Sequence, residues 1–217
     1  MTSKATKRGK ATTRAAKAET SAYHHGNLRA ELLQTAGEIV RNTGVHGLSL
    51  RDVARNAGVS NMAPYRHFDS KAALVAALAE EGFHGLTAAI KLAKAEAGAS
   101  PQAQFQAAGV AYVIFAAKHP AEFRLMFGPP EHFGDAPQVK EASQHAYKQL
   151  YDCIADCLTQ GFLKKDAAPE AIGQTSWALV HGLATLIVDG AISAKTNKAV
   201  EAVVVQSQAL LFKGISA

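Results

Sequence analysis

The chain has 217 residues, of which 48% are hydrophobic and only 7% aromatic, and it carries a net charge of +5. Its longest uncharged apolar run, Ala107 to Ala117, is shorter than the roughly 20 residues that span a membrane, and no hydrophobic stretch follows the basic N-terminus as a secretory signal requires. We therefore expect a cytoplasmic protein without membrane segments. Alanine supplies 44 of the residues, which favours helices because alanine loses no side-chain entropy in them.

The positive charge is concentrated at the N-terminal end. Residues 1–22 have a net charge of +5, residues 23–68 have +2, and the rest of the chain has −2. The first 22 residues contain no apolar side chain larger than alanine after Met1, so we expect a disordered basic arm there. This distribution indicates a polyanionic partner for the first third of the chain. A leader that merely solubilises the protein is the alternative for the arm.

Apolar residues at helical spacing predict a first helix over residues 27–44. Ser49, with an acidic residue three positions on, resembles a capping box and opens a second, short helix over residues 50–57. Ser60 is expected to cap a third helix over residues 61–68. Two short helices joined by a tight Gly-Val turn are typical of a helix-turn-helix.

Further helices are expected along the rest of the chain. A long fourth helix begins after Ser70, which can cap it. No alternating strand pattern or hairpin signal appears in the sequence. We therefore predict an all-α protein with a helix-turn-helix DNA-binding domain over residues 23–70 and a helical domain over residues 71–217. The later helices are predicted at residues 101–118, 120–128, 137–162, 169–192 and 197–213.

Residues 26–86 carry a pattern more specific than a generic helix-turn-helix. It consists of Leu48-Ser49-Leu50-Arg51-Asp52-Val53-Ala54, Ala57-Gly58-Val59-Ser60, Ala63-Pro64-Tyr65-Arg66-His67-Phe68, Ser70-Lys71 and Leu74. This pattern resembles the DNA-binding domain of tetracycline-repressor (TetR) type transcription regulators. Nearer the C-terminus, Trp177-Ala178-Leu179-Val180-His181-Gly182 looks like the Trp-His-Gly signature of one subgroup of C-terminal domains, and Pro120-Ala121-Glu122-Phe123-Arg124-Leu125-Met126-Phe127 resembles the segment preceding it.

The third predicted helix has side chains that are too polar and aromatic for a plain core helix. An α-helix fits the major groove, where Arg51 could reach guanine and Asn61 could pair with adenine. The resemblance implies base contacts from Arg51, Asn61, Met62, Ala63 and Tyr65, and phosphate contacts from Ser49, Arg66, His67 and Lys71, with Ser60 in the same surface. A solvated helix face is the alternative for each residue.

Pro64 departs from the family pattern, in which leucine is common at this position. As the fourth residue of the predicted helix, proline lacks the N–H of the first helical hydrogen bond and crowds the carbonyl of Ser60. We therefore expect the first turn of this helix to be loosened. Met62 and Ala63 offer no side-chain hydrogen bonds, so they could read only shape or a thymine methyl group.

The resemblance implies a ligand-responsive transcription regulator rather than an enzyme. We expect a repressor that binds a palindromic operator in double-stranded DNA as a homodimer and is released by a small-molecule inducer. The low charge of the middle helices suggests a small hydrophobic ligand. The expected pocket residues, for each of which ordinary core packing is the alternative, are Tyr112, Phe115, Phe123, Met126, Phe127, Tyr147, Tyr151, Trp177 and His181.

A homodimer is expected because one helix-turn-helix makes few base contacts, whereas two copies read half-sites about 34 Å apart. The predicted helix over residues 169–192 is apolar nearly all round, which is typical of a helix covered on both sides. The resemblance implies that the last two helices of each chain form a four-helix interface, and a monomer core is the alternative. The expected interface residues are Trp177, His181, Ala184, Val188, Val200, Val203, Ser207 and Leu210.

Other candidate chemistry in the sequence is incomplete. Cys153 and Cys157 lie one helical turn apart with Asp156 between them, which falls short of a zinc site, so we expect two buried thiols and no metal or cofactor. The adjacent side chains of His24 and His25 diverge and are expected near DNA. Common enzymatic motifs do not occur. The alternatives to a regulator are a nonspecific architectural DNA-binding protein acting through the basic arm and an enzyme with a vestigial helix-turn-helix.

Overall fold

The computed structural model describes residues 28–164 and 168–216. The expectations for the basic arm of residues 1–22 and for His24 and His25 lie outside this part of the chain. Within it the chain is all-α, as predicted, with eight α-helices and no strand. One isolated antiparallel bridge joins Leu163 to Ser216.

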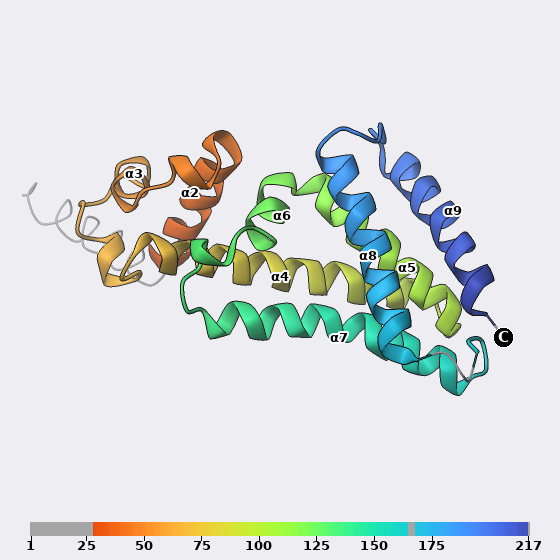
Figure 1. Cartoon of the computed structure of the whole chain (residues 1–217). Helices are drawn as coiled ribbons and strands as arrows, with labels where there is room; N and C mark the ends of the chain where they lie inside the picture. The colour runs from red at the N-terminus through yellow and green to blue at the C-terminus, as the bar shows by residue number, and fades with distance from the viewer. Residues whose placement is uncertain (1–27, 165–167, 217) are drawn as a thin grey trace, which may run out of the picture.

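The helices follow one another with short connections, three of which contain a three-residue 3₁₀ helix (Val45–Gly47, Pro64–Arg66 and Pro130–His132). The α-helices are α2 (Leu28–Thr43), α3 (Leu50–Asn56), α4 (Lys71–Glu96), α5 (Pro101–Lys118), α6 (Pro120–Met126), α7 (Pro137–Thr159), α8 (Pro169–Val188) and α9 (Asn197–Ile215). Figure 1 shows α2 and α3 at one end of α4, and α5 and α7 beside its other part, with α8 and α9 packed against α5.

Local sequence sets most of the helix starts. The side-chain oxygens of four capping residues each accept a hydrogen bond from the backbone N–H three residues on, at Ser49, Ser70, Ser100 and Thr196. Each bond satisfies an N–H group that the first helical turn leaves without a partner. Proline stands in the first helical turn, where its missing N–H costs nothing, at Pro101, Pro120, Pro137 and Pro169. These signals explain why the predicted starts of α3 to α9 are confirmed.

The predicted third helix over residues 61–68 is wrong, because only the 3₁₀ helix Pro64–Arg66 forms there. Pro64 has no N–H to donate to the carbonyl of Ser60, which accepts a hydrogen bond from the N–H of Ala63 instead (2.9 Å). Such bonds between residues three apart make the tighter 3₁₀ geometry, which persists only over short stretches. We expected only the first turn of this helix to be loosened, but the α-helical geometry is lost over the whole of residues 61–68.

α4 joins the two ends of the molecule as a single helix of 26 residues. Its buried side chains belong to one continuous apolar core that extends from Leu32 in α2 to Phe212 in α9. Because close-packed cores transmit displacement rather than absorb it, the two ends of the molecule are mechanically connected.

α4 and α8 are long and apolar enough to cross a membrane by length and composition alone. The core helices of a helical bundle share these properties, and both helices pack inside the bundle, α4 against α5 and α7, and α8 against α5 and α9. In the most apolar stretch of α8 only 28% of the residues are buried inside the chain, compared with 50% for α4. α8 therefore has an apolar face that a single chain leaves uncovered.

Candidate nucleic-acid interface and buried cavity

The N-terminal cap of α3 fixes the first turn of that helix. Ser49 Oγ accepts a hydrogen bond from the backbone N–H of Asp52 (3.1 Å) and donates one to Asp52 Oδ2 (2.5 Å). Arg55 donates to the other carboxylate oxygen of Asp52. The Ser49 hydroxyl and the Arg55 guanidinium hold the pKa of the Asp52 carboxyl below its ordinary value. Arg51, beside Asp52 in this fixed turn, is exposed.

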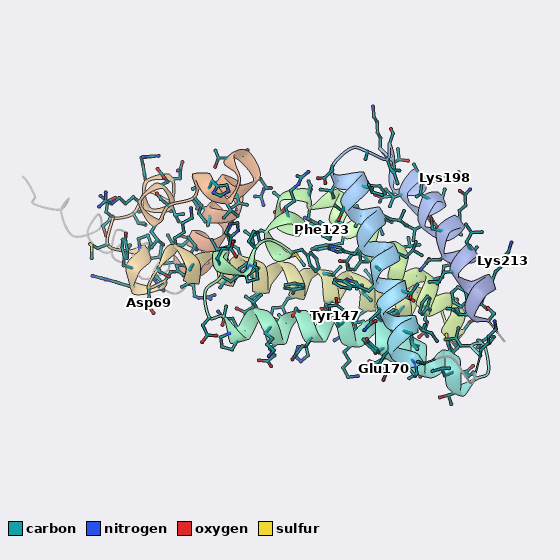
Figure 2. The ribbon with its side chains drawn as sticks, viewed as in Figure 1. Asp69, Phe123, Tyr147, Glu170, Lys198 and Lys213 are labelled. Carbon is teal, nitrogen blue, oxygen red and sulfur yellow. The ribbon has the colours of Figure 1, made fainter. Side chains whose placement is uncertain are left out.

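Residues 60–68, which we call the reading segment, place their polar side chains and those of Met62 and Tyr65 in solvent. Met62 is 66% exposed and Tyr65 43% exposed, which is unusual for such apolar side chains. Pro64 and Phe68 are buried and anchor the segment to the core. The other side chains are exposed at Ser60, Asn61, Arg66 and His67 and half-buried at Ala63. Figure 2 labels the neighbouring Asp69 at this end of the molecule.

Exposed basic side chains surround the reading segment. Arg51, Arg66 and Lys71 all lie on the surface. Lys71 Nζ donates a hydrogen bond to the carbonyl of His46 (3.3 Å), which ties the start of α4 to the turn after α2. Phosphate contacts require surface cations, and base contacts require side chains that reach into a groove. Residues of both kinds are exposed in α3, the reading segment and the start of α4, and of the predicted DNA-contact residues only Ser49 and Ala63 are half-buried.

A cavity of about 50 Å³ lies inside the bundle between α4, α5, α7, α8 and α9. Four of the predicted pocket residues line it, namely Tyr112, Phe127, Tyr147 and Trp177. Two others lie behind this lining: the His181 ring centre is 4.7 Å from that of Phe127, and the Phe123 ring centre is 5.0 Å from it. Figure 2 shows Phe123 and Tyr147 in the middle of the bundle.

Three predicted pocket residues lie outside the cavity. Phe115 stacks beside His119, with 4.8 Å between ring centres. Met126 packs against Gly82 of α4, and Tyr151 is 37% exposed. Their assignment to a ligand pocket stays a prediction that this cavity does not support, because residue type alone does not tell which face of a helix turns inward.

Sequence reasoning missed several cavity residues. Phe83, Leu86 and Ile90 of α4 line the cavity, and their spacing on one helix face is a signal that could have identified them. Ser176 and Gln208 also line it and are only 3% and 2% exposed. Each is a polar residue within the buried, otherwise apolar stripe of its helix, α8 or α9, and this irregularity is the signal in their case.

A buried polar pair lies at the edge of the cavity. Tyr112 Oη is 2.8 Å from His181 Nδ1. Burial raises the pKa of the Tyr112 phenol and lowers the pKa of the His181 imidazole. Both groups are therefore uncharged near neutral pH, and they share one hydrogen bond.

Of the α8 residues predicted for a dimer interface, Ala184 is completely buried by its own chain, so its assignment is wrong. Trp177, His181 and Val188 are half-buried, and their place in an interface stays a prediction. The ring centre of Trp177 lies 4.9 Å from that of Tyr147 and 5.2 Å from that of His181. An apolar stripe at helical spacing shows that a face is covered, but not whether its own chain or a partner covers it.

The α9 residues predicted for the interface divide between two faces. Val200 is 2% exposed and belongs to the chain's own core, so its assignment is wrong. Val203 and Ser207 are half-buried, and Leu210 is 70% exposed. On α8 the exposed large apolar side chain is Leu186, at 45%.

α6 contacts the helix-turn-helix, the cavity and the end of α8. Glu122 Oε1 accepts a hydrogen bond from Arg41 Nη1 of α2 at 2.7 Å. Arg124 donates to the last carbonyl of α8 (2.9 Å) and to the carboxylate of Asp189 (2.8 Å). Phe127, which caps the C-terminus of α6, lines the cavity. A displacement of Phe127 would therefore also displace α2, because the short helix α6 contacts both.

Cys153 and Cys157 are buried and free, as expected. Burial raises the pKa of both thiols, that of Cys157 to about 11. Both are therefore protonated near neutral pH and pack as small apolar side chains in α7.

Two family models match the chain. Residues 32–78, which include α3 and the reading segment, match the bacterial regulatory proteins of the tetR family. Residues 105–206, which contain most of the cavity-lining positions, match the tetracyclin repressor-like C-terminal domain. The chain belongs to the TetR family. It is a DNA-binding helix-turn-helix transcription regulator and not an enzyme.

Relatives of this TetR-family chain include regulators and a protein of unknown function. The HTH-type transcriptional activator FasR of Mycolicibacterium smegmatis is 26% identical over 163 residues, which cover 75% of this chain and 70% of FasR. A solved structure of a protein with unknown function from Rhodococcus sp. RHA1 is 36% identical, covers 90% of this chain and 98% of its own, and superposes with a TM-score of 0.79.

Two more distant TetR-family structures show the fold alone. PfmR from Thermus thermophilus is 19% identical, with 84% of this chain and 97% of PfmR covered and a TM-score of 0.64. The ketosteroid transcriptional regulator KstR2 of Mycobacterium tuberculosis is also 19% identical, with 87% and 95% covered and a TM-score of 0.62. The Trp-His-Gly subgroup of the C-terminal domain stays a prediction.

Proposed function

We propose that this regulator is a ligand-responsive repressor that binds a palindromic operator as a homodimer and is released when a small molecule enters the cavity. One observation carries the proposal: α6 links Phe127 in the cavity to Arg41 of α2 through Glu122, while α4 runs alongside both sites. We retain the division into a DNA-binding domain (23–70) and a ligand-binding and dimerisation domain (71–217), and we propose a cytoplasmic location, where the operator is accessible.

The reading segment and the first turn of α3 form the proposed DNA contact. Arg51 reaches a base edge from the capped turn, and Asn61 reaches another from the reading segment. Because the segment contains only a short 3₁₀ turn, it presents Met62 and Tyr65 to the DNA groove on a compact turn rather than on the face of a long helix. The phosphate contacts are proposed for Ser49, Arg66, His67 and Lys71, and further contacts in the groove for Ser60 and Ala63.

The proposed dimer interface is the outer side of α8 and α9. The most apolar stretch of α8 is only 28% buried by its own chain, and Leu186 and Leu210 are exposed large side chains on the two helices. Ala178 and Ala202 are also exposed, and small residues allow helices to approach closely. Large exposed apolar patches commonly mark sites where a partner binds. Two copies joined here would form a four-helix interface and carry two reading segments.

Ligand binding is proposed to shift the protein between two arrangements. The cavity volume of about 50 Å³ is well below the roughly 300–1,000 Å³ of typical ligand pockets. A ligand larger than a few water molecules must therefore displace lining side chains, and among these Phe127 belongs to the end of α6. If the displaced arrangement binds the operator less well, ligand and operator weaken each other's binding by the same factor.

The sign of regulation is proposed as repression, because a dimer released by its ligand frees the DNA that it occupied. The Mycolicibacterium relative is named an activator, so a promoter reporter with and without the regulator tests this point separately. Lower expression in the presence of the regulator supports repression, and higher expression contradicts it.

Selection of bound sequences from random duplexes, with the purified full chain, tests the proposal. We expect a palindromic consensus whose half-sites are about one helical turn apart. A ratio of specific to nonspecific affinity near one would instead support the architectural protein that acts through its basic arm. Equal ligand affinity for free and operator-bound protein would contradict release by a ligand.

A further inference from the structure

We propose that the cavity takes an uncharged, mainly apolar molecule that carries a hydrogen-bond donor such as a hydroxyl group, and that Ser176 and Gln208 recognise this donor. This inference rests on the cavity as the ligand site of the proposed function and specifies the chemistry of the ligand.

Ser176 Oγ and Gln208 Oε1 are buried polar atoms without a hydrogen-bond partner among the residues that the structure describes. Both residues line the cavity, at 3% and 2% exposure. A buried polar group without a partner loses its hydration and gains nothing in return, so native proteins keep few of them and usually for a reason. The cavity is the space from which a partner for both atoms can come.

The two residues, Ser176 and Gln208, lie in the same part of the cavity lining, on either side of Val180. A Cβ atom built on Gly109 of α5 would lie 2.1 Å from Gln208 Nε2 and 3.2 Å from Val180 Cγ1, so the Gln208 amide and Val180 flank the same glycine. Ser176 stands one helical turn before Val180 on the buried stripe of α8. The absence of a side chain at Gly109 leaves room for the amide, and a larger residue there would push it out of this position.

The direction of the hydrogen bond follows from the atoms. An amide oxygen can only accept, whereas a serine hydroxyl can both donate and accept. A ligand hydroxyl can donate to Gln208 Oε1 and accept from Ser176 Oγ, which satisfies both atoms at once. An ether or an ester offers no donor and leaves Gln208 Oε1 without a partner.

The rest of the lining determines the charge and polarity of the ligand. None of the residues that line the cavity is Lys, Arg, His, Asp or Glu, and most are aliphatic or aromatic. The nearby Tyr112 phenol is already bonded to His181. A carboxylate or an ammonium group would lose its hydration without gaining a counter-ion, which is far more costly than burying a neutral hydroxyl with its partners.

A water molecule is the competing occupant. The cavity volume of about 50 Å³ exceeds the roughly 10–15 Å³ that one water requires, and water also donates and accepts. A ligand hydroxyl that takes the place of this water keeps both hydrogen bonds, whereas an ether loses one of them. Comparing an alcohol with its ether isomer therefore separates specific recognition from simple filling of an apolar space.

The test uses 1-octanol, its isomer heptyl methyl ether, and octanoate as probes of the full chain. Trp177 is the only tryptophan in the sequence and lines the cavity, so its fluorescence reports binding. We expect octanol to bind at least about tenfold more tightly than the ether, which is the size of effect expected for one unsatisfied buried acceptor, and octanoate to bind more weakly than either.

Gln208→Met removes the acceptor and nearly preserves the side-chain shape, so we expect it to bring the alcohol-to-ether affinity ratio close to one while the ether still binds. Ser176→Ala should lower the ratio as well. Gln206→Met, at an exposed position two residues away on α9, is the matched control and should keep the ratio of the unaltered chain. Because the ratio is measured within each variant, a general loss of stability does not imitate the effect.

Equal binding of octanol and ether by the unaltered chain would overturn the donor inference but leave the cavity as a ligand site. If neither apolar probe binds, the inference and the cavity's role in the proposed function both fail. Operator binding, measured on the same sample, then tests the DNA-binding part of the proposal independently.

Discussion

Arg41 of α2 and Glu122 of α6 form an ion pair across the junction between the helix-turn-helix and the rest of the chain, with 2.7 Å between Arg41 Nη1 and Glu122 Oε1. The Arg41 side chain is 49% exposed, whereas that of Glu122 is only 25% exposed. The pair therefore fixes the position of α6 against α2 more than it stabilises the fold, since partly exposed ion pairs contribute about 0–1 kcal/mol.

Arg41→Gln should lower the free energy of unfolding by at most about 1 kcal/mol but reduce the effect of a cavity ligand on operator binding. The physical reason is that α6 would move without drawing α2 with it. The measurement is operator affinity with and without 1-octanol. Lys148→Gln, which breaks the exposed Lys148–Asp152 pair on α7, is the control and should leave the ligand effect intact. If the ligand still weakened operator binding to the same extent in Arg41→Gln, the Arg41–Glu122 pair would not couple the cavity to the DNA-binding domain.

Arg51→Ala and Lys71→Ala should weaken DNA binding in different ways. Loss of the Arg51 guanidinium should cost about 1–3 kcal/mol and relax preference at one base pair, because a base contact is lost. Loss of the Lys71 ammonium should weaken all sequences alike and lower the salt slope by about one, because a phosphate contact is lost. Titrations over a salt series, on the selected operator and on single-base variants, distinguish the two. Identical behaviour of both variants would refute the division into base and phosphate contacts.

Protonation of His181 should destabilise the fold on the acidic side of neutrality. Burial places the pKa of this imidazole in the folded chain below its ordinary value of 6.5, and the rings packed around it, those of Tyr112, Phe123, Phe127 and Trp177, carry no charge near neutral pH. The unfolded chain then binds the proton more readily. The stability contributed by the neutral ring is therefore fully present above about pH 6.5 and is lost as the pH falls below that value.

We expect His181→Asn to lose less stability than the unaltered chain between about pH 7.5 and pH 5.5, as measured by urea unfolding. His84→Gln, at an exposed position on α4, serves as the comparison and should follow the unaltered chain. Parallel stability curves for His181→Asn and the unaltered chain would contradict the assignment.

Leu186→Asp and Leu210→Asp should convert the proposed dimer to a monomer and lower operator affinity, because each places a carboxylate in the apolar face of α8 and α9. Sedimentation analysis measures the oligomeric state. Leu92→Asp is the matched control, since Leu92 is 62% exposed on α4, outside the proposed interface. A dimer that survives both interface substitutions would rule out this face.

The helices could be predicted from the sequence because their limits are coded locally. Ser49, Ser70 and Thr196 cap helices through their own side chains, and their effect does not depend on distant residues. The reading segment was predicted as a helix because its flanking signals are helical. A single missing N–H at Pro64 outweighed them.

The candidate sites were predicted less completely, because they depend on which helix face meets which neighbour. Trp177 and His181 were assigned both to a ligand pocket and to a dimer interface, since periodicity does not identify what covers a face. In the structure the two rings pack against each other. Gln208 was missed because it stands on the same buried side of α9 as Val204, among apolar residues. Its unusual position becomes visible only when its oxygen is found without a partner.

The length of α4 amplifies small rotations of this helix into larger displacements of its ends. At about 1.5 Å per residue, its 26 residues make a rigid arm about 39 Å long. The cavity contacts α4 around Leu86, which is 15 residues and about 22 Å from Lys71, so a tilt of about 5° there would move the Lys71 end by about 2 Å, more than half the spacing of successive base pairs. A small rearrangement of side chains around a bound molecule would thus change the separation of the two reading segments of a dimer, so that they no longer match the two DNA half-sites, while every helix stays folded.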